Sequence, residues 1–323
     1  MIRLAFLGCG QAARMHSRTL ARVAPAVPRY YASRDGARAA ACNRELRGGG
    51  AFDGYDAAIE DAWIDVVLVA TPPASHLDLT LHALRAGKHV IVEKPAFLRS
   101  ADFGAAAEAE ASSGRRVFVA ENYFYKPLLR VLREVVGSGE LGEVRFVHVN
   151  ALKEQRAADW RNDAALSGGG ALFEGGVHWI DFVANLGLEL RSVRGFRPAG
   201  GEPERSMLVA LEYGNGAVGS LSYSWEIHSP LRGLRMSRIY GTGGAVAFES
   251  NGIFLAQTGR RTRVRFPGLR DIAGYGAMFR DFVDAIAADR APAFTLAHAR
   301  RDVELIEQAY RTAGTVGVEE TKA

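Results

Sequence analysis

The stretch that decides the fold is Ile2-Arg3-Leu4-Ala5-Phe6-Leu7-Gly8-Cys9-Gly10-Gln11-Ala12-Ala13. Its first six residues form an apolar run of strand length, and a helical pattern follows the second glycine. In a loop of this GxGxxA form, the first glycine permits a tight turn and the second lets backbone N–H groups approach a pyrophosphate. The small third residue lets the helix pack closely on the strand. The stretch therefore predicts a strand–loop–helix unit that opens a parallel sheet.

The same loop predicts dinucleotide binding, because the amino end of the following helix carries a partial positive charge that attracts phosphate. A glycine turn in an unrelated α/β domain is the alternative that the loop alone leaves open. If the loop binds a dinucleotide, we expect the contacts to come from Gly8, Cys9, Gly10, Gln11 and Ala12.

The end of the second expected strand, 29–32, bears on which dinucleotide binds. NAD-specific domains usually place an Asp or Glu here, to accept a hydrogen bond from the ribose 2′-hydroxyl. This chain has Ser33 and Arg34 there, with Arg38 one helical turn further, and a guanidinium suits a 2′-phosphate. The sequence thus favours NADP(H). NAD(H) stays possible, because a register shift of two would bring Asp35 to this position.

Three further apolar runs, at 66–70, 89–92 and 117–120, alternate with helical patterns. Strands that alternate with helices predict right-handed βαβ crossovers and a doubly wound parallel sheet. We therefore expect an α/β fold whose amino-terminal part, residues 1–121, is a Rossmann domain.

Glu93-Lys94-Pro95 directly follows the apolar run at 89–92. A lysine at the carboxyl end of a buried strand, followed by a proline, has less freedom than a surface lysine. Because ligands of open parallel sheets bind at the carboxyl ends of the strands, Lys94 is a candidate functional residue.

The second half of the chain carries a glycine-rich loop at 167–170, followed by Glu174 and His178. These two residues are four apart, so they lie on one helix face if the helix begins by Glu174. A carboxylate beside an imidazole holds a general base in its tautomer and tunes its pKa. A capped core histidine is the alternative for His178.

Trp160 and Arg161 offer an aromatic face and a donor fork that suit a polyhydroxylated ring, although core packing is the commoner role of a tryptophan.

Glycine-rich turns at 214–216 and 241–244 join runs of alternating polarity into two hairpins. They predict that residues 122–323 form an α+β domain with a large, mainly antiparallel open sheet. Helices at about 275–288 and 298–312 are expected to cover one face of it. The expected strands are 144–149, 207–213, 217–226, 234–240, 245–249, 254–257 and 262–266.

The composition excludes several classes of function. The 323 residues, 48% of them hydrophobic and 24% charged, are typical of a soluble globular protein. Lys and Arg exceed Asp and Glu by 40 − 36 = 4 and are spread along the chain, so no nucleic-acid partner is indicated. No apolar run approaches a membrane span and no signal peptide precedes the first strand, so we expect a cytoplasmic protein with no membrane partner. The two cysteines match no disulfide framework or metal spacing, and no metal is expected.

Three motifs give the chain a family resemblance. They are Gly8-x-Gly10-x-x-Ala13-x-x-His16, Thr71-Pro72-Pro73-x-x-His76 and Glu93-Lys94-Pro95. In this order and spacing they resemble the cofactor domain of the glucose–fructose oxidoreductase, inositol dehydrogenase and rhizopine-catabolism (Gfo/Idh/MocA) family. The resemblance implies that Lys94 contacts the reacting hydroxyl beside the nicotinamide. It also places Thr71, Pro72, Pro73, His76 and Glu93 in the cofactor site.

The resemblance extends to the second half, where the family often reads Gly-Gly-Gly-x-Leu-x-Asp-x-Gly-x-His-x-x-Asp. This chain departs from the pattern at Glu174, where the family usually has Asp, so the carboxylate is kept but extended by one methylene. The resemblance implies that Glu174 and His178 act beside Lys94. It also implies that Tyr123, Trp160 and Arg161 lie near the substrate and that the uncovered sheet face forms the interface of a homodimer or homotetramer.

The sequence therefore predicts an NAD(P)-dependent oxidoreductase acting on a secondary hydroxyl or ketone of a sugar, inositol or related polyol. His178 would move the hydroxyl proton, Glu174 would orient it or act alongside it, and Lys94 would stabilise the developing alkoxide. Two alternatives stay open: a glycosidase that oxidises its sugar transiently with NAD, and a sensor that binds the cofactor without turnover.

Overall fold

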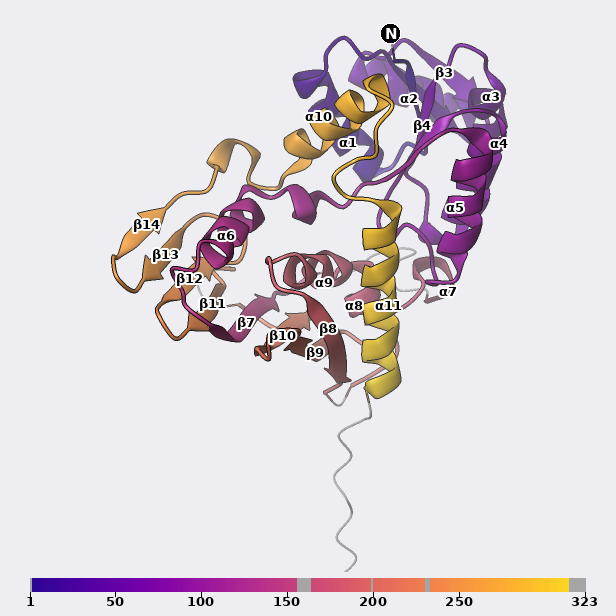
Figure 1. Cartoon of the computed structure of the whole chain (residues 1–323). Helices are drawn as coiled ribbons and strands as arrows, with labels where there is room; N and C mark the ends of the chain where they lie inside the picture. Colours follow the sequence, from indigo (N-terminus) through magenta and orange to yellow (C-terminus); the bar gives the residue numbers. More distant parts are fainter. Residues whose placement is uncertain (1, 156–163, 199, 230–232, 314–323) are drawn as a thin grey trace, which may run out of the picture. The chain divides into compact units, whose positions relative to one another are not determined.

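The computed structural model describes residues 2–155, 164–198, 200–229 and 233–313 (Figure 1). The chain forms two compact units. The first comprises Met1–Asn122 and Gly274–Arg300, and the second comprises Tyr123–Ala273 and Arg301–Ala323. The segment Gly274–Arg300, expected from the sequence to lie in the carboxyl-terminal domain, thus belongs to the first unit. In the described ranges, no helix is both long enough and apolar enough to cross a membrane.

A six-stranded sheet with the order β3-β2-β1-β4-β5-β6 forms the centre of the first unit. All its pairings are parallel, and every residue of β1, β4 and β5 is buried. This arrangement confirms the predicted doubly wound sheet. The strands are β1 (Leu4–Leu7), β2 (Arg29–Ser33), β3 (Gly50–Asp53), β4 (Val66–Val69), β5 (His89–Val92) and β6 (Val117–Val119).

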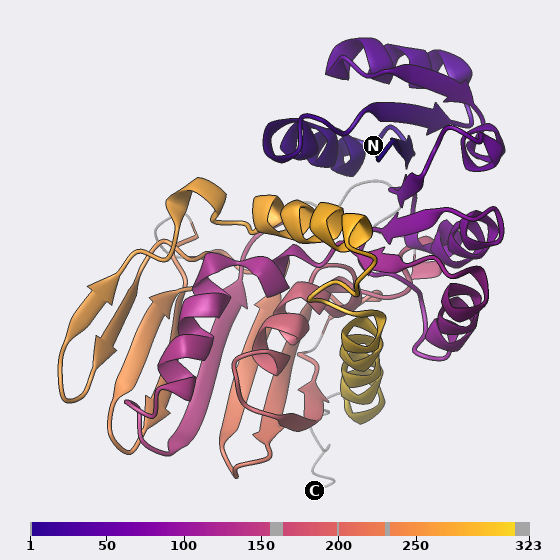
Figure 2. The same ribbon diagram turned by 45° about the horizontal axis from the view of Figure 1, so that its top comes forward.

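Helices lie on both faces of this sheet (Figure 2). On one side α1 packs against α2 and α10, and on the other α4 packs against α3 and α5. Two such layers explain why the central strands are apolar throughout instead of alternating. The helices are α1 (Gln11–Val23), α2 (Gly36–Leu46), α3 (Tyr55–Glu60), α4 (His76–Arg85), α5 (Asp102–Ser113) and α10 (Tyr275–Ala287), with a 3₁₀ turn η1 (Pro73–Ser75) before α4.

An eight-stranded sheet with the order β14-β13-β12-β11-β7-β10-β9-β8 forms the second unit. Strands β7 and β10 pair in parallel and the other pairs are antiparallel, as the sequence predicted for this half. The strands are β7 (Val144–Leu152), β8 (Leu190–Phe196), β9 (Ser206–Tyr213), β10 (Val218–Ser224), β11 (Met236–Gly241), β12 (Ala245–Glu249), β13 (Leu255–Thr258) and β14 (Arg263–Arg265).

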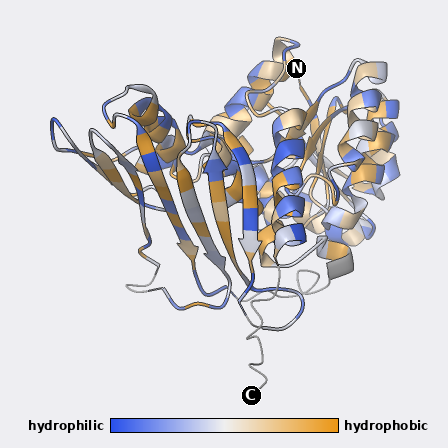
Figure 3. Ribbon diagram, turned by 60° about the horizontal axis from the view of Figure 1, so that its bottom comes forward, coloured by the Kyte–Doolittle hydropathy of each residue, from blue (hydrophilic) through white to orange (hydrophobic). Residues whose placement is uncertain are grey.

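Hydrophobic and hydrophilic residues alternate along the strands of this second sheet (Figure 3). Helices cover one face: the Tyr213 hydroxyl on β9 donates to the Val183 carbonyl on α9 (3.2 Å), and the Gly195 N–H on β8 donates to the Thr312 hydroxyl on α11 (2.9 Å). Large apolar side chains on the other face stay exposed. The remaining elements of this unit are η2 (Asn122–Tyr125, which starts at the unit boundary), α6 (Pro127–Gly137), α7 (Ala164–Ser167), α8 (Ala171–Glu174), α9 (Val177–Ala184), η5 (Leu269–Asp271) and α11 (Leu296–Thr312, which begins in the first unit).

Candidate active site

The parallel register brings the predicted cofactor residues to one edge of the first sheet. Leu7 pairs with Val69, and Val69 pairs with Val92, so the residues that follow β1, β4 and β5 emerge together. Two hydrogen bonds continue this alignment, from the Ala70 N–H to the Leu7 carbonyl (2.9 Å) and from the Glu93 N–H to the Val69 carbonyl (3.0 Å). The glycine loop, Thr71 and Lys94 therefore lie at the carboxyl edge, where ligands of this fold bind.

The glycine loop has the geometry that a pyrophosphate requires. Gly8 has a φ of +111°, and a Cβ there would lie 2.7 Å from the Ala70 carbonyl oxygen. Gly10 is the N-cap of α1, so no N-cap side chain accepts from the first N–H groups of the helix, and a Cβ on Gly10 would meet no described atom within 4 Å. The space beside Gly10 and the absence of a capping side chain at the amino end of α1 fit a dinucleotide bound at residues 8–12.

The side chains of this loop differ in what they offer. Cys9 is buried, and its thiol donates to the Ala32 carbonyl at 3.8 Å. Burial is the main cause that raises the pKa of the Cys9 thiol to about 12, and the neighbouring Cys42 raises it further. Cys9 can therefore contact a cofactor only through its backbone. Gln11 is exposed and, with Ala12, supplies backbone N–H groups at the first turn of α1.

Strand β2 ends at Ser33, as the NADP(H) interpretation requires. Asp35, the residue that a shifted register would have placed there, is the N-cap of α2: its carboxylate accepts from the N–H groups of Ala37 (2.9 Å) and Arg38 (3.2 Å). Burial raises the pKa of the Tyr55 phenol and the charge of Arg34 opposes this rise, which places Arg34 close to Tyr55. Within the described ranges, neither Arg34 nor Arg38 forms an ion pair with a carboxylate.

His76 ties together two loops of the same edge. Its Nε2 lies 2.9 Å from the Thr71 carbonyl oxygen, and its Nδ1 lies 3.0 Å from the Pro95 carbonyl oxygen. The Ser75 hydroxyl donates to the Thr71 hydroxyl (2.7 Å) and so fixes the start of the Pro72–Pro73 turn. His76 is 1% exposed, and its two ring nitrogens hold the backbone of Thr71 and of Pro95, the residue after Lys94.

Glu93 anchors the backbone of Lys94. Its carboxylate accepts from the Lys94 N–H (2.9 Å) and from Nε2 of His16. Burial alone would raise the pKa of Glu93, but the charge and hydrogen bond of His16, together with Lys94, hold it well below its usual range. The His16 ring is fully buried and packs edge-on against Tyr275 and Phe279. His16 is thus a positioning residue that the sequence analysis named in a motif but did not assign to the site.

The helix expected to carry both Glu174 and His178 is interrupted. Helix α8 ends at Glu174 and α9 begins at Val177, so the two residues do not share one continuous helix. The two intervening glycines are tightly packed: a Cβ on Gly175 would lie 2.2 Å from the Tyr223 hydroxyl, and one on Gly176 would lie 2.6 Å from the Leu172 carbonyl oxygen. The four-residue spacing alone therefore does not place their side chains on one face.

The His178 ring stacks on Tyr123, with ring centroids 4.5 Å apart and an interplanar angle of 13°. The ammonium of Lys126 lies 4.5 Å from the centre of the same tyrosine ring. Glu174 is buried. Burial raises the pKa of the Tyr223 phenol, the hydrogen bond from Trp225 opposes this rise, and the charge of Glu174 adds to it. The structure thus groups Tyr123 with His178. Trp160 and Arg161 lie outside the described residues.

Two family models match the chain, and their ranges follow the two sheets. The "Oxidoreductase family, NAD-binding Rossmann fold" model matches residues 2–121. The "GFO/IDH/MocA C-terminal domain" model matches residues 129–247.

Among curated proteins, the chain is 35% identical over 204 residues to dTDP-3,4-didehydro-2,6-dideoxy-alpha-D-glucose 3-reductase of Streptomyces violaceoruber, which covers 60% of this chain and 57% of the relative. It is 24% identical over 254 residues to inositol 2-dehydrogenase of Salmonella typhimurium, and this alignment covers 75% of this chain and 72% of the relative. The first of these alignments thus spans little more than half of the relative. A solved structure of levoglucosan dehydrogenase with NADH and levoglucosan superposes with a TM-score of 0.86 over 97% of both chains, at 21% identity.

Proposed function

The chain belongs to the Gfo/Idh/MocA oxidoreductase family, and on this basis we propose that it is an NAD(P)-dependent sugar or polyol oxidoreductase. It would transfer a hydride between the nicotinamide and a secondary hydroxyl or ketone. The observation that carries the proposal is the carboxyl edge of the first sheet. There the uncapped amino end of α1 and the anchored loop of Lys94 emerge from neighbouring parts of one parallel sheet.

In this proposal each side chain has a distinct role. Lys94 donates to the substrate oxygen and stabilises the alkoxide that develops as the carbinol loses its hydride. His178 accepts or returns the hydroxyl proton, and its stacking on Tyr123 sets the plane of the imidazole. Glu174 orients His178 or shares its proton. When bound, the nicotinamide supplies the hydride chemistry.

The substrate class rests on the relatives. Their names denote a reductase of a dTDP-linked deoxysugar, an inositol dehydrogenase and a levoglucosan dehydrogenase, and each name refers to a cyclic sugar or polyol. We extend this to a cyclic sugar or polyol here, with the particular substrate and the direction of reaction open. The longer Glu174, in place of the family's usual Asp, sets this chain apart at the residue most directly concerned with pose.

A substrate screen tests the function. Sugars, inositols and keto-sugars are offered with NADP(H) and with NAD(H), while nicotinamide absorbance and product sugars are followed together. A stoichiometric change in absorbance supports a dehydrogenase. Released hydrolysed sugar without a net change in cofactor would instead show a glycosidase, and cofactor binding without any product would show a sensor.

NADP(H) is the cofactor that we propose within this function. Arg34 and Arg38 are exposed and unpaired with any described carboxylate, and Asp35 is occupied as a helix cap. We expect Arg34→Ala to weaken NADPH binding by about tenfold and to leave NADH binding nearly unchanged, because only NADPH presents a 2′-phosphate. Arg44→Ala, an exposed arginine further along α2, is the matched control. Equal losses for both cofactors in Arg34→Ala would contradict the assignment.

We also propose that a second copy of the chain covers the exposed face of the eight-stranded sheet. The register places Val218 and Tyr240 on either side of Phe146, and these side chains are 45%, 39% and 49% exposed. Contiguous apolar surface of this kind marks an association site. Light scattering should show a dimer or tetramer that Phe146→Glu dissociates. A wild-type monomer at micromolar concentration would contradict this interface.

A further inference from the structure

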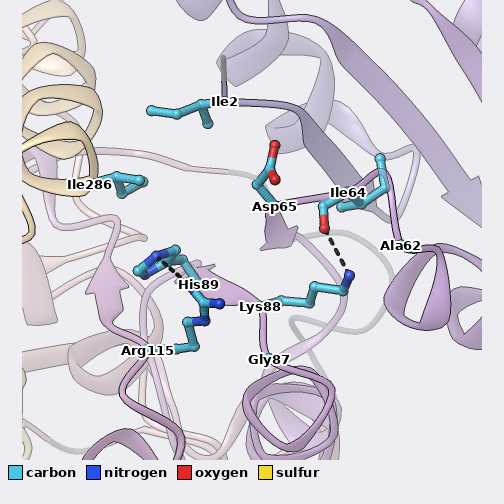
Figure 4. Close-up of a pocket in the computed structure, with 9 residues that line it drawn as sticks. All are labelled: Ile2, Ala62, Ile64, Asp65, Gly87, Lys88, His89, Arg115 and Ile286. Carbon is cyan, nitrogen blue, oxygen red and sulfur yellow. Dashed lines mark hydrogen bonds between the residues drawn. The ribbon is translucent and has the colours of Figure 1, made fainter.

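Figure 4 shows a cavity of the first unit, whose volume is ≈ 390 Å³. The strand bounds place it at the amino ends of the strands, the edge opposite to the glycine loop. Its walls come from residues at or just before the amino ends of β1, β4, β5 and β6, and from α10. Ile2, Ile64 and Ile286 supply an apolar side, and Lys88, His89 and Arg115 supply a polar one. Strand β5, four residues long, separates this cavity from Lys94 by about 10 Å.

The tautomer of His89 follows from its contacts. The backbone N–H of Arg116 lies 3.1 Å from Nδ1 of His89, and a backbone N–H can only donate, so Nδ1 carries no proton. The proton of the imidazole therefore sits on Nε2. Nη1 of Arg115 lies 3.5 Å from that Nε2, in the contact dashed in Figure 4. Two N–H donors thus face each other across the polar side of the cavity, and the group that satisfies both is an acceptor.

The charges around this pair favour an anionic acceptor. In the described part of the chain, no carboxylate pairs with the guanidinium of Arg115. Lys88 is 7% exposed, and its ammonium donates to the backbone carbonyls of Asp61 (2.7 Å) and Ile64 (2.8 Å). The carboxylates of Asp61 and Asp65 act on its charge, but neither forms a salt bridge with it in the described part of the chain. The one carboxylate among the described lining residues, Asp65, accepts two hydrogen bonds from the Arg3 guanidinium at 2.9 and 3.0 Å.

We propose that this cavity binds a small organic carboxylate, one oxygen accepting from His89 Nε2 and the other from Arg115, with its apolar body against Ile2, Ile64 and Ile286. Two donors 3.5 Å apart match the two oxygens of one carboxylate. The volume lies within the range of small-molecule sites. The isoleucines give an inorganic ion nothing to contact, so they favour an anion with an organic body. This site is separate from the proposed cofactor edge and does not depend on the proposed function.

Sodium benzoate is a suitable probe, and calorimetry of the whole chain is a suitable measurement. We expect saturable binding at one site, about tenfold weaker in Arg115→Gln because one charge-assisted hydrogen bond is lost. Arg116→Gln is the matched control: its guanidinium lies beside Asp289 (3.7 Å) and outside the lining, so it should bind benzoate as the wild type does. Benzamide, which has the same ring without the charge, should bind about tenfold more weakly than benzoate.

Several outcomes would overturn the proposal. They are the absence of saturable benzoate binding, equal losses in Arg115→Gln and Arg116→Gln, or competition between benzoate and saturating NADPH. Binding of inorganic phosphate in preference to benzoate would overturn the proposed ligand class. A measurement without any variant adds an independent test: benzoate should shift the ¹⁵N resonances of the His89 imidazole. Unchanged resonances at saturating benzoate would contradict the contact.

Discussion

Two lysines lie at opposite ends of strand β5. Lys88 is the residue before the strand, and Lys94 is the second residue after it, following Glu93. Lys88 is buried, and its ammonium donates to two backbone carbonyls of the loop that leads into β4. Lys94 is held through its backbone, by the carboxylate of Glu93. The comparison shows that two lysines at the two ends of one strand are held in different ways, one through its side chain and one through its backbone. At the amino end the ammonium of the lysine binds the carbonyls of a loop, and at the carboxyl end the Glu93 carboxylate fixes the main chain of the lysine.

The largest effect is expected at the carboxyl end. Lys94→Ala should lower kcat by about 10²–10³-fold, because it removes the donor that stabilises the developing alkoxide. NADPH affinity should change little, since Gly8, Gly10 and the amino end of α1 are untouched. Steady-state kinetics and a fluorescence titration of NADPH measure both quantities. If Lys94→Ala turned over at the wild-type rate, Lys94 would not stabilise the developing alkoxide.

Much of this carboxyl edge could be predicted from the sequence. Gly8, Gly10 and Lys94 lie at strand ends whose apolar runs are unambiguous, because both faces of the parallel sheet are covered. The hairpin turns at 214–216 and 241–244 were also readable, since their glycines join strands of alternating polarity.

Other features of the structure could not be predicted from the sequence pattern. Strand β3 lies at the sheet edge with a half-exposed pattern, so its residues, Gly50–Asp53, show no apolar run. The break between α8 and α9 depends on close packing of Gly175 and Gly176 against Tyr223 and Leu172, which spacing does not reveal. His16 looks like a core residue on the buried face of α1. Its role depends on Glu93, 77 positions later in the chain.

At the amino end of β5, substitution should change stability. Lys88→Met keeps the aliphatic stem and removes the ammonium, so the carbonyls of Asp61 and Ile64 lose their partner. We expect a loss of about 1–3 kcal/mol in the free energy of unfolding, the usual result of leaving buried polar groups unsatisfied. Denaturant titration measures it. A stability equal to that of the wild type would show that Lys88 does not hold this loop.

The smallest effect concerns Asp65, also at the amino edge. Burial raises the pKa of its carboxyl, but the hydrogen bonds and charge of Arg3 outweigh this and lower it below the ordinary 3.8. A lowered pKa means that the stabilisation is present above about pH 4 and is lost as the pH falls through the folded-state value. Because the pair is partly exposed, we expect Asp65→Asn to destabilise by about 0.2–1 kcal/mol at pH 7.

Unfolding curves of the wild type and Asp65→Asn between pH 7 and pH 3 check the sign. The difference in unfolding free energy between the two proteins should shrink as the pH falls. A difference that grows toward acid would mean that the pKa of Asp65 is raised in the folded state, and the role assigned to Arg3 would be wrong.

One measurement tests hydride transfer itself. Reduced NADP carrying deuterium at nicotinamide C4, on the face that the enzyme uses, is incubated with a keto-sugar that the screen identifies, and the product is analysed by mass spectrometry and NMR. Direct hydride transfer should place one deuterium on the new carbinol carbon of the product, and almost none in the same period with Lys94→Ala. A reduced product whose carbinol carbon carries no deuterium from either face of the cofactor would contradict it.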